Sequence, residues 1–392
     1  MASRRGIPEL PWELQDAILA RLPLRDAARS SVLSSSWGRS WRHLGELDFV
    51  SSPPPAAASL PVAAATAVAC DKAAIDAILL HQHPGPVQRV RLRVTDELLP
   101  GVPAWMASLS EKGSSRWTSP CAPCTGRRRT PCTAPSSPAA RLRRLSLGRF
   151  ALPAAPEHFA GFPALATLSL TGTAFRNARD LEALVAMSPR LEELRMCCIA
   201  VDVDCREHGG DGRRKVRMVS SSLRFLRIDG MGNVEFVGAR LPRVSQADFA
   251  QASYPSAPNL LSAMVTSLET LDYYYYALPL SPTKLLKGLP SSYKNLKRLK
   301  VHLDFNHAPP ILSTLNFLRT APNLTQLVIQ DFTDDSYAQS PYPLAAELYG
   351  NLCPSLLFLQ MSYVTSQNNE MDFIRLILSK ARMLQIWSIM SM

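Results

Sequence analysis

The chain has 392 residues, of which 46% are hydrophobic and 19% charged, and a formal net charge of +11. This composition is that of a globular rather than a disordered protein, and the length indicates two or three domains or a small domain followed by an elongated array. There is no run of eighteen apolar residues, and the start MASRRGIPEL lacks the apolar core of a signal peptide. We therefore expect no membrane partner, a location in the cytoplasm or nucleus, and eight cysteines that remain reduced.

Residues 7–42 predict three short helices. Pro11 suits a first helical position, and a periodic set of apolar residues follows it: Leu14, Ile18, Leu19 and Leu22. A second helix fits residues 24–33, and a third carries Trp37 and Trp41 on one face. Domains as small as about forty residues rarely bury a sufficient core alone, so we expect a partner protein to complete the burial.

This stretch resembles the plant F-box, from its Leu10-Pro11 start to its Ser-Val-Leu-Ser end before Trp37. The resemblance implies that the helices dock on the Skp-type adaptor of a cullin-RING ubiquitin ligase, and through it on a cullin. It assigns the adaptor contact, or its direct support, to Leu10, Pro11, Leu14, Ile18, Leu22, Val32 and Trp37. The chain departs from the motif at Ser35, Ser36 and Gly38, where basic residues are usual. A helical hairpin that only packs on the rest of the chain is the alternative.

A Pro- and Ala-rich stretch at 49–70 predicts a linker after an F-box domain at 1–48. Asp71 then begins a predicted helix that ends near His81 and His83. This H-x-H pair has no acidic or thiol partner at ligand spacing, so we interpret it as polar residues at a helix end and predict no metal site.

The pattern L-x-x-L-x-L dominates the remainder of the chain. Its units begin at Leu142, Leu165, Leu191, Leu223, Leu268, Leu296, Leu324, Leu356 and, more loosely, Leu384. Successive starts lie 23 to 32 residues apart, except for a step of 45 that a degenerate unit at Leu241-Val244 divides. This spacing is typical of leucine-rich repeats, in which each unit supplies a short strand and a helical return and the leucines stack into one spine. Helical returns are predicted at 177–187, 311–318, 344–352 and 371–378.

Recognition of another molecule must then use strand residues that alternate with the leucines, because these point away from the spine. The candidate target-binding residues are Arg195, Arg227, Tyr273, Tyr275, Lys300 and His302. The tyrosine run at 273–276 is the most unusual of these places, and its alternative role is to cover the edge of the core.

Residues 114–140 break the pattern, since they contain no aliphatic residue larger than Ala and no acidic residue. We predict a disordered insertion there, or a short out-of-frame segment of the gene; Cys121, Cys124 and Cys132 are too few for a zinc site. Eight arginines and no acid lie between Ser114 and Arg149, which accounts for most of the net charge. Because this excess is local and lacks a nucleic-acid-binding motif, we expect no nucleic-acid partner.

Residues 356–392 resemble the FBD segment that ends many plant F-box/leucine-rich-repeat proteins, and we expect them to cap the open end of the repeats. The predicted fold is therefore α/β: a small three-helix F-box followed by a leucine-rich-repeat solenoid at 71–355, with a curved parallel sheet and helical returns. No catalytic motif stands out, so we expect no enzyme and no cofactor.

By resemblance, the predicted function is that of a substrate-recognition subunit of an SCF-type ubiquitin ligase, which holds an unknown target protein on its repeats. Two alternatives remain open. One is a repeat scaffold, the product of a decaying gene, whose weakened F-box no longer binds. The other is a receptor whose repeats need a small molecule to bind their target.

Overall fold

The computed structural model describes residues 10–22, 24–30, 35–49, 72–92, 98, 101–118, 130–131, 142–148, 150–152, 162–201, 214–230, 234–250, 257–274, 292–333, 352–365 and 368–391. The chain forms two compact units. The first unit comprises residues 1–176 and 187–190, and the second comprises residues 177–186 and 191–392.

The first unit begins with helices α1 (Trp12–Leu19), α2 (Leu24–Arg29), α3 (Ser35–Ser40) and η2 (Trp41–His43). Pro11 is the N-cap of α1 rather than its first residue, and its carbonyl accepts the N–H groups of Leu14 at 3.0 Å and Gln15 at 3.1 Å. The buried side chain of Gln15 joins α1 to α3, because Ser40 Oγ donates to Gln15 Oε1 at 2.8 Å. The small core of these helices contains Leu19, Leu24, Ala27, Trp37, Trp41 and Leu44.

The main sheet of the first unit is parallel, with its strands in the order β1 (Glu46–Asp48), β2 (Arg89–Arg91), β3 (Arg116–Thr118), β5 (Arg144–Gly148) and β7 (Thr167–Thr171). Three helical segments lie between the early strands: α5 (Lys72–Asp76), the π-helix η3 (Ala77–Gln82) and α6 (Val102–Glu111). Shorter strands pair beside this sheet: β4 (Thr130–Pro131), β6 (Phe150–Leu152) and β8 (Ala174–Phe175). The end of the predicted F-box domain, residues 46–48, is thus the first strand of the repeats.

The predicted disordered break at 114–140 is wrong at its start. Residues 116–118 form strand β3, which pairs with β2 on one side and β5 on the other. Trp117 takes the buried position that leucine occupies in other repeats and is only 2% exposed. The L-x-x-L-x-L pattern does not reveal this strand, because a single indole stands in place of the usual leucines. Strand β4 adds two described residues, and 119–129 and 132–140 lie outside the described residues.

In the second unit, eight parallel strands follow one another in sheet order: β9 (Glu193–Cys197), β12 (Phe225–Asp229), β14 (Gln246–Ala250), β15 (Thr270–Tyr274), β16 (Arg298–Leu303), β17 (Gln326–Asp331), β18 (Phe358–Val364) and β19 (Ile386–Ser391). Its helices are α7 (Ala178–Ala186), α8 (Ala257–Ala263), α10 (Ala308–Thr320) and α11 (Asn368–Lys380). Short strands β11 (Arg214–Val216) and β13 (Val234–Phe236) pair with each other, and β10 spans Ala200–Val201. The predicted repeat strands, including the degenerate unit near 241–244, are confirmed.

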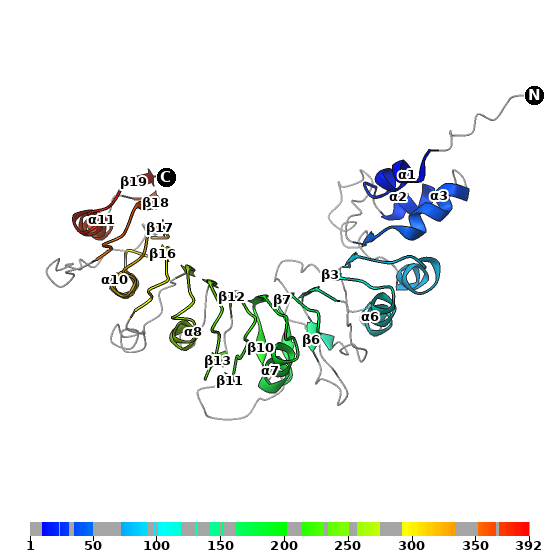
Figure 1. Ribbon diagram of the computed structural model, residues 1–392, viewed down its shortest axis with the longest axis horizontal. Coiled ribbons are helices and arrows are strands. Elements are labelled where there is room, and N and C mark those ends of the chain that lie inside the picture. The colour runs from blue at the N-terminus through cyan, green and yellow to red at the C-terminus, as the bar shows by residue number, and fades with distance from the viewer. Residues whose placement is uncertain are drawn as a thin grey trace, which may run out of the picture. The chain divides into compact units, whose positions relative to one another are not determined.

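Three of the four predicted helical returns match α7, α10 and α11, whereas residues 344–352 lie outside the described residues except for Leu352. Figure 1 shows α8, α10 and α11 on the same side of the strands. The leucine spine is buried as predicted: both leading leucines of most units are 0–1% exposed, as in Leu226, Leu271, Leu299 and Leu327. Side-chain amides connect neighbouring repeats of the second unit. Asn295 Nδ2 donates to the Thr266 carbonyl at 2.6 Å, and Asn323 Nδ2 donates to the Lys294 carbonyl at 2.8 Å.

The C-terminal segment continues the ladder through β18, α11 and β19. In β19, however, Trp387 and Ile389 occupy spine positions in register with Leu359 and Met361, yet they are 59% and 38% exposed. Among the described residues, no further repeat stacks on these two side chains. That helix α11 and strand β19 cap the repeats stays a prediction. No described helix is long and apolar enough to cross a membrane.

A buried acidic pair, Asp331 of β17 and Glu370 of α11, makes the stability of the fold depend on pH. Burial, together with the nearby buried Glu370, raises the pKa of the Asp331 carboxyl to about 7, although Thr333 donates to it. A carboxyl group with a raised pKa in the folded state stabilises the fold fully below the unfolded value of 3.8 and loses this contribution as the pH rises through 7.

We therefore expect the free energy of unfolding to decline between about pH 4 and pH 7, and Asp331→Asn to remove most of that decline. Urea unfolding at a series of pH values measures it. The exposed Asp372→Asn variant serves as the control and should keep the wild-type slope. An unchanged slope in Asp331→Asn would contradict the prediction.

Candidate functional site

One candidate site is an exposed apolar face on the first helix. Leu14 and Ile18 of α1 and Leu22 just after it are spaced by four residues and are 52%, 41% and 40% exposed. We call these three residues the α1 face. Soluble proteins rarely expose a contiguous group of large apolar side chains, and such a group usually marks a site where another molecule binds. The buried side of the same helix is formed by Gln15 and Leu19.

The structure places the other predicted adaptor-binding residues differently. The Leu10 carbonyl accepts a hydrogen bond from Gln15 Nε2 at 2.8 Å, and Pro11 caps α1, so both residues shape the start of the helix. Trp37 is buried in the core of the unit, which suits support rather than direct contact. Val32 lies outside the described residues. Trp12, 71% exposed at the start of α1, was not predicted.

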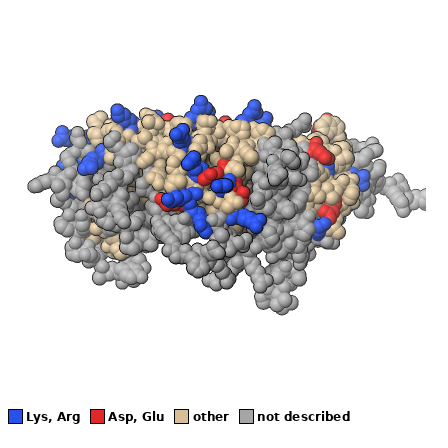
Figure 2. All heavy atoms as spheres, turned by 90° about the horizontal axis from the view of Figure 1, so that it is seen from below, with Lys and Arg blue, Asp and Glu red and all other residues tan. Residues whose placement is uncertain are grey.

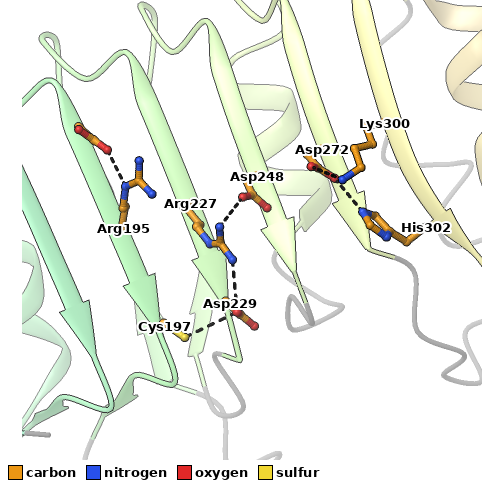
Figure 3. Close-up of polar contacts among 9 residues, drawn as sticks. Arg195, Cys197, Arg227, Asp229, Asp248, Asp272, Lys300 and His302 are labelled. Atoms are coloured by element: carbon orange, nitrogen blue, oxygen red, sulfur yellow. Dashed lines mark hydrogen bonds and ion pairs between the residues drawn. The ribbon is translucent and has the colours of Figure 1, made fainter. Parts of the chain in front are cut away.

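A second candidate site runs across the strands of the second unit. The central residues of five neighbouring strands stand in register: Arg195, Arg227, Asp248, Asp272 and Lys300. We call these five residues the charged row. Their side chains point away from the spine and form ion pairs along the sheet (Figure 3). The row thus unites three of the predicted target-binding residues with two aspartates between them.

The ion pairs of the charged row balance most of its charge. Arg227 Nη1 lies 3.0 Å from Asp248 Oδ2, and Lys300 Nζ lies 3.5 Å from Asp272 Oδ2. Arg195 Nε lies 2.5 Å from the Glu193 carboxylate of its own strand. A surface that satisfies its own charges in this way favours specificity over strong attraction, because a partner must replace each ion pair.

Arg227 is expected to stabilise the fold through Asp248. Burial raises the pKa of the Asp248 carboxyl, and the nearby Arg227 guanidinium opposes that shift. Arg227→Ala leaves the mostly buried carboxylate without this cation and should lower the free energy of unfolding by about 1–2 kcal/mol. Adding Asp248→Asn should recover part of the loss, which chemical denaturation of the single and double variants measures. Additive effects of the two substitutions would contradict this coupling.

Two predicted target-binding residues are buried, which corrects their assignment as exposed contacts. Tyr273 is 7% exposed and packs edge-on against Phe249 with a centroid distance of 6.4 Å. It faces the spine, so its alternative role as part of the core is the correct one. His302 is 2% exposed because Tyr274 of the neighbouring strand stacks on it at 3.3 Å, and its Nε2 lies 3.3 Å from Asp272 Oδ1. Tyr275 lies outside the described residues.

Cys197 ends strand β9 below the charged row, where its thiol lies 3.6 Å from Asp229 Oδ2 (Figure 3). Burial, with the nearby Asp229 carboxylate, raises the pKa of Cys197 to about 12, which keeps it a protonated, unreactive thiol. Cys197, Cys198 and Cys353 are free in the described part of the chain, and no group of three His, Cys, Asp or Glu residues there is placed to hold a metal ion.

Charges of both signs are also mixed on one face of the molecule. On the face drawn in Figure 2, Lys and Arg side chains lie beside Asp and Glu near the middle of the view. A nucleic-acid-binding surface usually presents one sign of charge over a broad area. The expectation of no nucleic-acid partner stays a prediction.

Parallel strands on a buried leucine spine, with helical returns on one side, define a leucine-rich-repeat protein, and here three short helices precede them. Residues 102–329 match the family model described as FBD-associated F-box protein At5g56370, LRR repeats, and residues 7–48 match the F-box domain. The chain is 24% identical to the F-box/FBD/LRR-repeat protein At1g13570 of Arabidopsis thaliana over 424 residues, which cover 98% of this chain and 91% of that protein. The chain belongs to the family of FBD-associated F-box proteins with leucine-rich repeats.

Proposed function

We propose that the chain is the substrate-recognition subunit of an SCF-type ubiquitin ligase. In this proposal, the F-box binds a Skp-type adaptor, and through it a cullin, while the repeats bind a target protein. The observation that carries it is the α1 face: three aligned apolar side chains are exposed on the first helix of a segment that matches the F-box domain. Burial of such a face is the dominant favourable term in most protein associations.

The mechanism would be one of proximity. Two binding surfaces on one chain raise the effective concentration of a target lysine near the ubiquitin-carrying enzyme. The chain itself supplies no chemistry in this scheme. In the same proposal it acts beside the other subunits in the cytoplasm or nucleus. The charged row supports the second half of the proposal, because five neighbouring strands present polar side chains on the face away from the spine, with Arg195 exposed and the other four partly exposed.

The test is binding of the purified chain to a purified plant Skp-type adaptor, measured by isothermal titration calorimetry. We expect a one-to-one complex with submicromolar affinity. Circular dichroism of the same sample establishes that the chain is folded. A folded chain that does not bind at micromolar concentrations would overturn the proposal and leave a repeat scaffold with an inactive F-box.

A further inference from the structure

Three arginines stand side by side on the repeat strands of the first unit. Arg89 of β2, Arg116 of β3 and Arg144 of β5 occupy the same register position on neighbouring strands. Arg91 and Thr118 stand two residues further along the same face. These five residues line a hollow of about 210 Å³, which we call the arginine pocket. All five belong to one unit, so the pocket does not depend on the placement of the other.

The acidic neighbours of the arginine pocket lie on one side of it. Glu46 of β1 pairs with Arg89 at 3.2 Å, and Asp48 pairs with Arg91 at 3.1 Å. For Arg116 and Arg144, the ion pairs among the described residues include no acidic partner. Neighbouring strands lie about 4.8 Å apart, and like charges directly opposite one another destabilise a sheet. The pocket therefore holds two positive charges whose repulsion an anion would relieve.

The donors of the pocket suit a phosphate group. A guanidinium presents a planar fork of N–H groups that binds phosphate oxygens in pairs, and the Thr118 hydroxyl adds another donor. A phosphate monoester carries about −1.5 to −2 charges near neutral pH, which matches the two arginines without acidic partners. A carboxylate would neutralise only one of them.

The surroundings of the pocket favour a short segment with a single phosphate over a long polyanion. Two rows of residues in register form the pocket, one through Arg89 and one through Arg91. On the β1 side these rows end in Glu46 and Asp48, which repel further negative charge. On the other side they continue into the hydroxyl residues Thr167 and Ser146, which carry no charge. An anion is thus attracted over the width of about three strands only, and a neutral peptide flank fits beside it.

We propose that the arginine pocket binds a phosphorylated serine or threonine of a target protein. That the phosphorylated protein is a ubiquitination target rests on the proposed function above, whereas binding of the phosphorylated peptide does not. Recognition of phosphorylated segments by clustered arginines is a general mode of peptide binding. In this proposal, phosphorylation of the target creates the group that the pocket holds, so the chain selects the modified form.

The test uses two fluorescent peptide libraries with the same random flanks, one with a fixed central phosphoserine and the other with serine. Fluorescence anisotropy with the full-length chain at about 150 mM salt should show at least tenfold tighter binding of the phosphoserine library. Free phosphoserine should compete. Equal binding of the two libraries would overturn the proposal.

Charge-matched variants identify the site. Arg116→Gln/Arg144→Gln should abolish the preference for phosphoserine, and Arg116→Lys/Arg144→Lys should weaken it several-fold because lysine keeps the charge but lacks the fork. Arg143→Gln/Arg298→Gln removes the same charge outside the pocket and should keep the preference. Equal loss in the two glutamine variants would show general charge attraction and overturn the assignment. So would tighter, Arg116- and Arg144-dependent binding of a single-stranded oligonucleotide of matched charge.

Adaptor binding of the same samples separates this proposal from the preceding one. The Arg116→Gln/Arg144→Gln variant should bind the Skp-type adaptor as the wild type does, because its substitutions lie on β3 and β5 rather than on α1. Adaptor binding without phosphoserine preference would remove the pocket proposal alone. Phosphoserine preference without adaptor binding would remove the ligase role and retain the pocket.

Discussion

Replacing Leu14 and Ile18 together by alanine is expected to lower the affinity for a Skp-type adaptor by about 100-fold or more. A few central apolar side chains usually carry most of the energy of an interface, and two of them at about 1.5 kcal/mol each account for this loss. Both side chains are exposed in the free chain. Their truncation should therefore change the free energy of unfolding by no more than about 0.5 kcal/mol.

Two control variants make this result interpretable. Leu378→Ala/Met383→Ala truncates exposed apolar side chains far along the sequence and should leave adaptor binding unchanged. Leu19→Ala, on the buried side of the same helix, should instead cost about 2–5 kcal/mol of stability. Unchanged adaptor affinity in Leu14→Ala/Ile18→Ala would exclude the α1 face as the contact, even if the wild-type chain binds. Variants at Leu10 or Pro11 are poorer tests, since both residues shape the start of the helix.

Trp117→Ala is expected to have the largest effect on stability, about 3–5 kcal/mol. The indole is 2% exposed and stands in register between the buried Val90 and Leu145. Its removal leaves a cavity in the spine between two neighbouring repeats, which a short three-residue strand cannot close by shifting. Denaturant unfolding followed by circular dichroism measures the loss.

The same substitution tests whether β3 is a genuine repeat strand. Trp117→Phe should remain close to the wild type, because the indole N–H has no hydrogen-bond partner in the described residues and phenylalanine retains most of the apolar volume. Trp387→Ala, which truncates a 59% exposed indole in β19, should cost less than 1 kcal/mol. If Trp117→Ala unfolds like the wild type, residues 116–118 are not part of the packed ladder.

Much of the fold follows from periodicity alone. The L-x-x-L-x-L units predict the strands of the main sheet from β5 onward but not the shorter strands β6, β8, β10, β11 and β13, because only a strand that stacks on the spine needs the recurring spine residues. The pattern is absent from β1 and β3, which have three residues each and a single buried side chain, Leu47 or Trp117. One apolar residue defines no period. Such strands are recognised only when their neighbours supply the hydrogen bonds of the ladder.

The candidate sites show a similar division. Arg195, Arg227 and Lys300 were predicted on the exposed face because they alternate with spine leucines, and the structure places all three there. The same alternation also predicts an exposed His302. At the ends of β15 and β16, however, Tyr274 stacks on His302 and covers it. That contact joins residues 28 positions apart, so no local pattern reveals it.

The amino-acid sequence by itself determined the class of this protein, since the F-box motif and the leucine period are local patterns written along the chain. Only the tertiary structure decided which side chains stand next to each other across strands. The arginine pocket brings together residues from β2, β3 and β5, and the charged row does the same from five further strands. The physical reason is the register of the parallel ladder: hydrogen bonds between backbones, rather than spacing in the sequence, set which residues become neighbours.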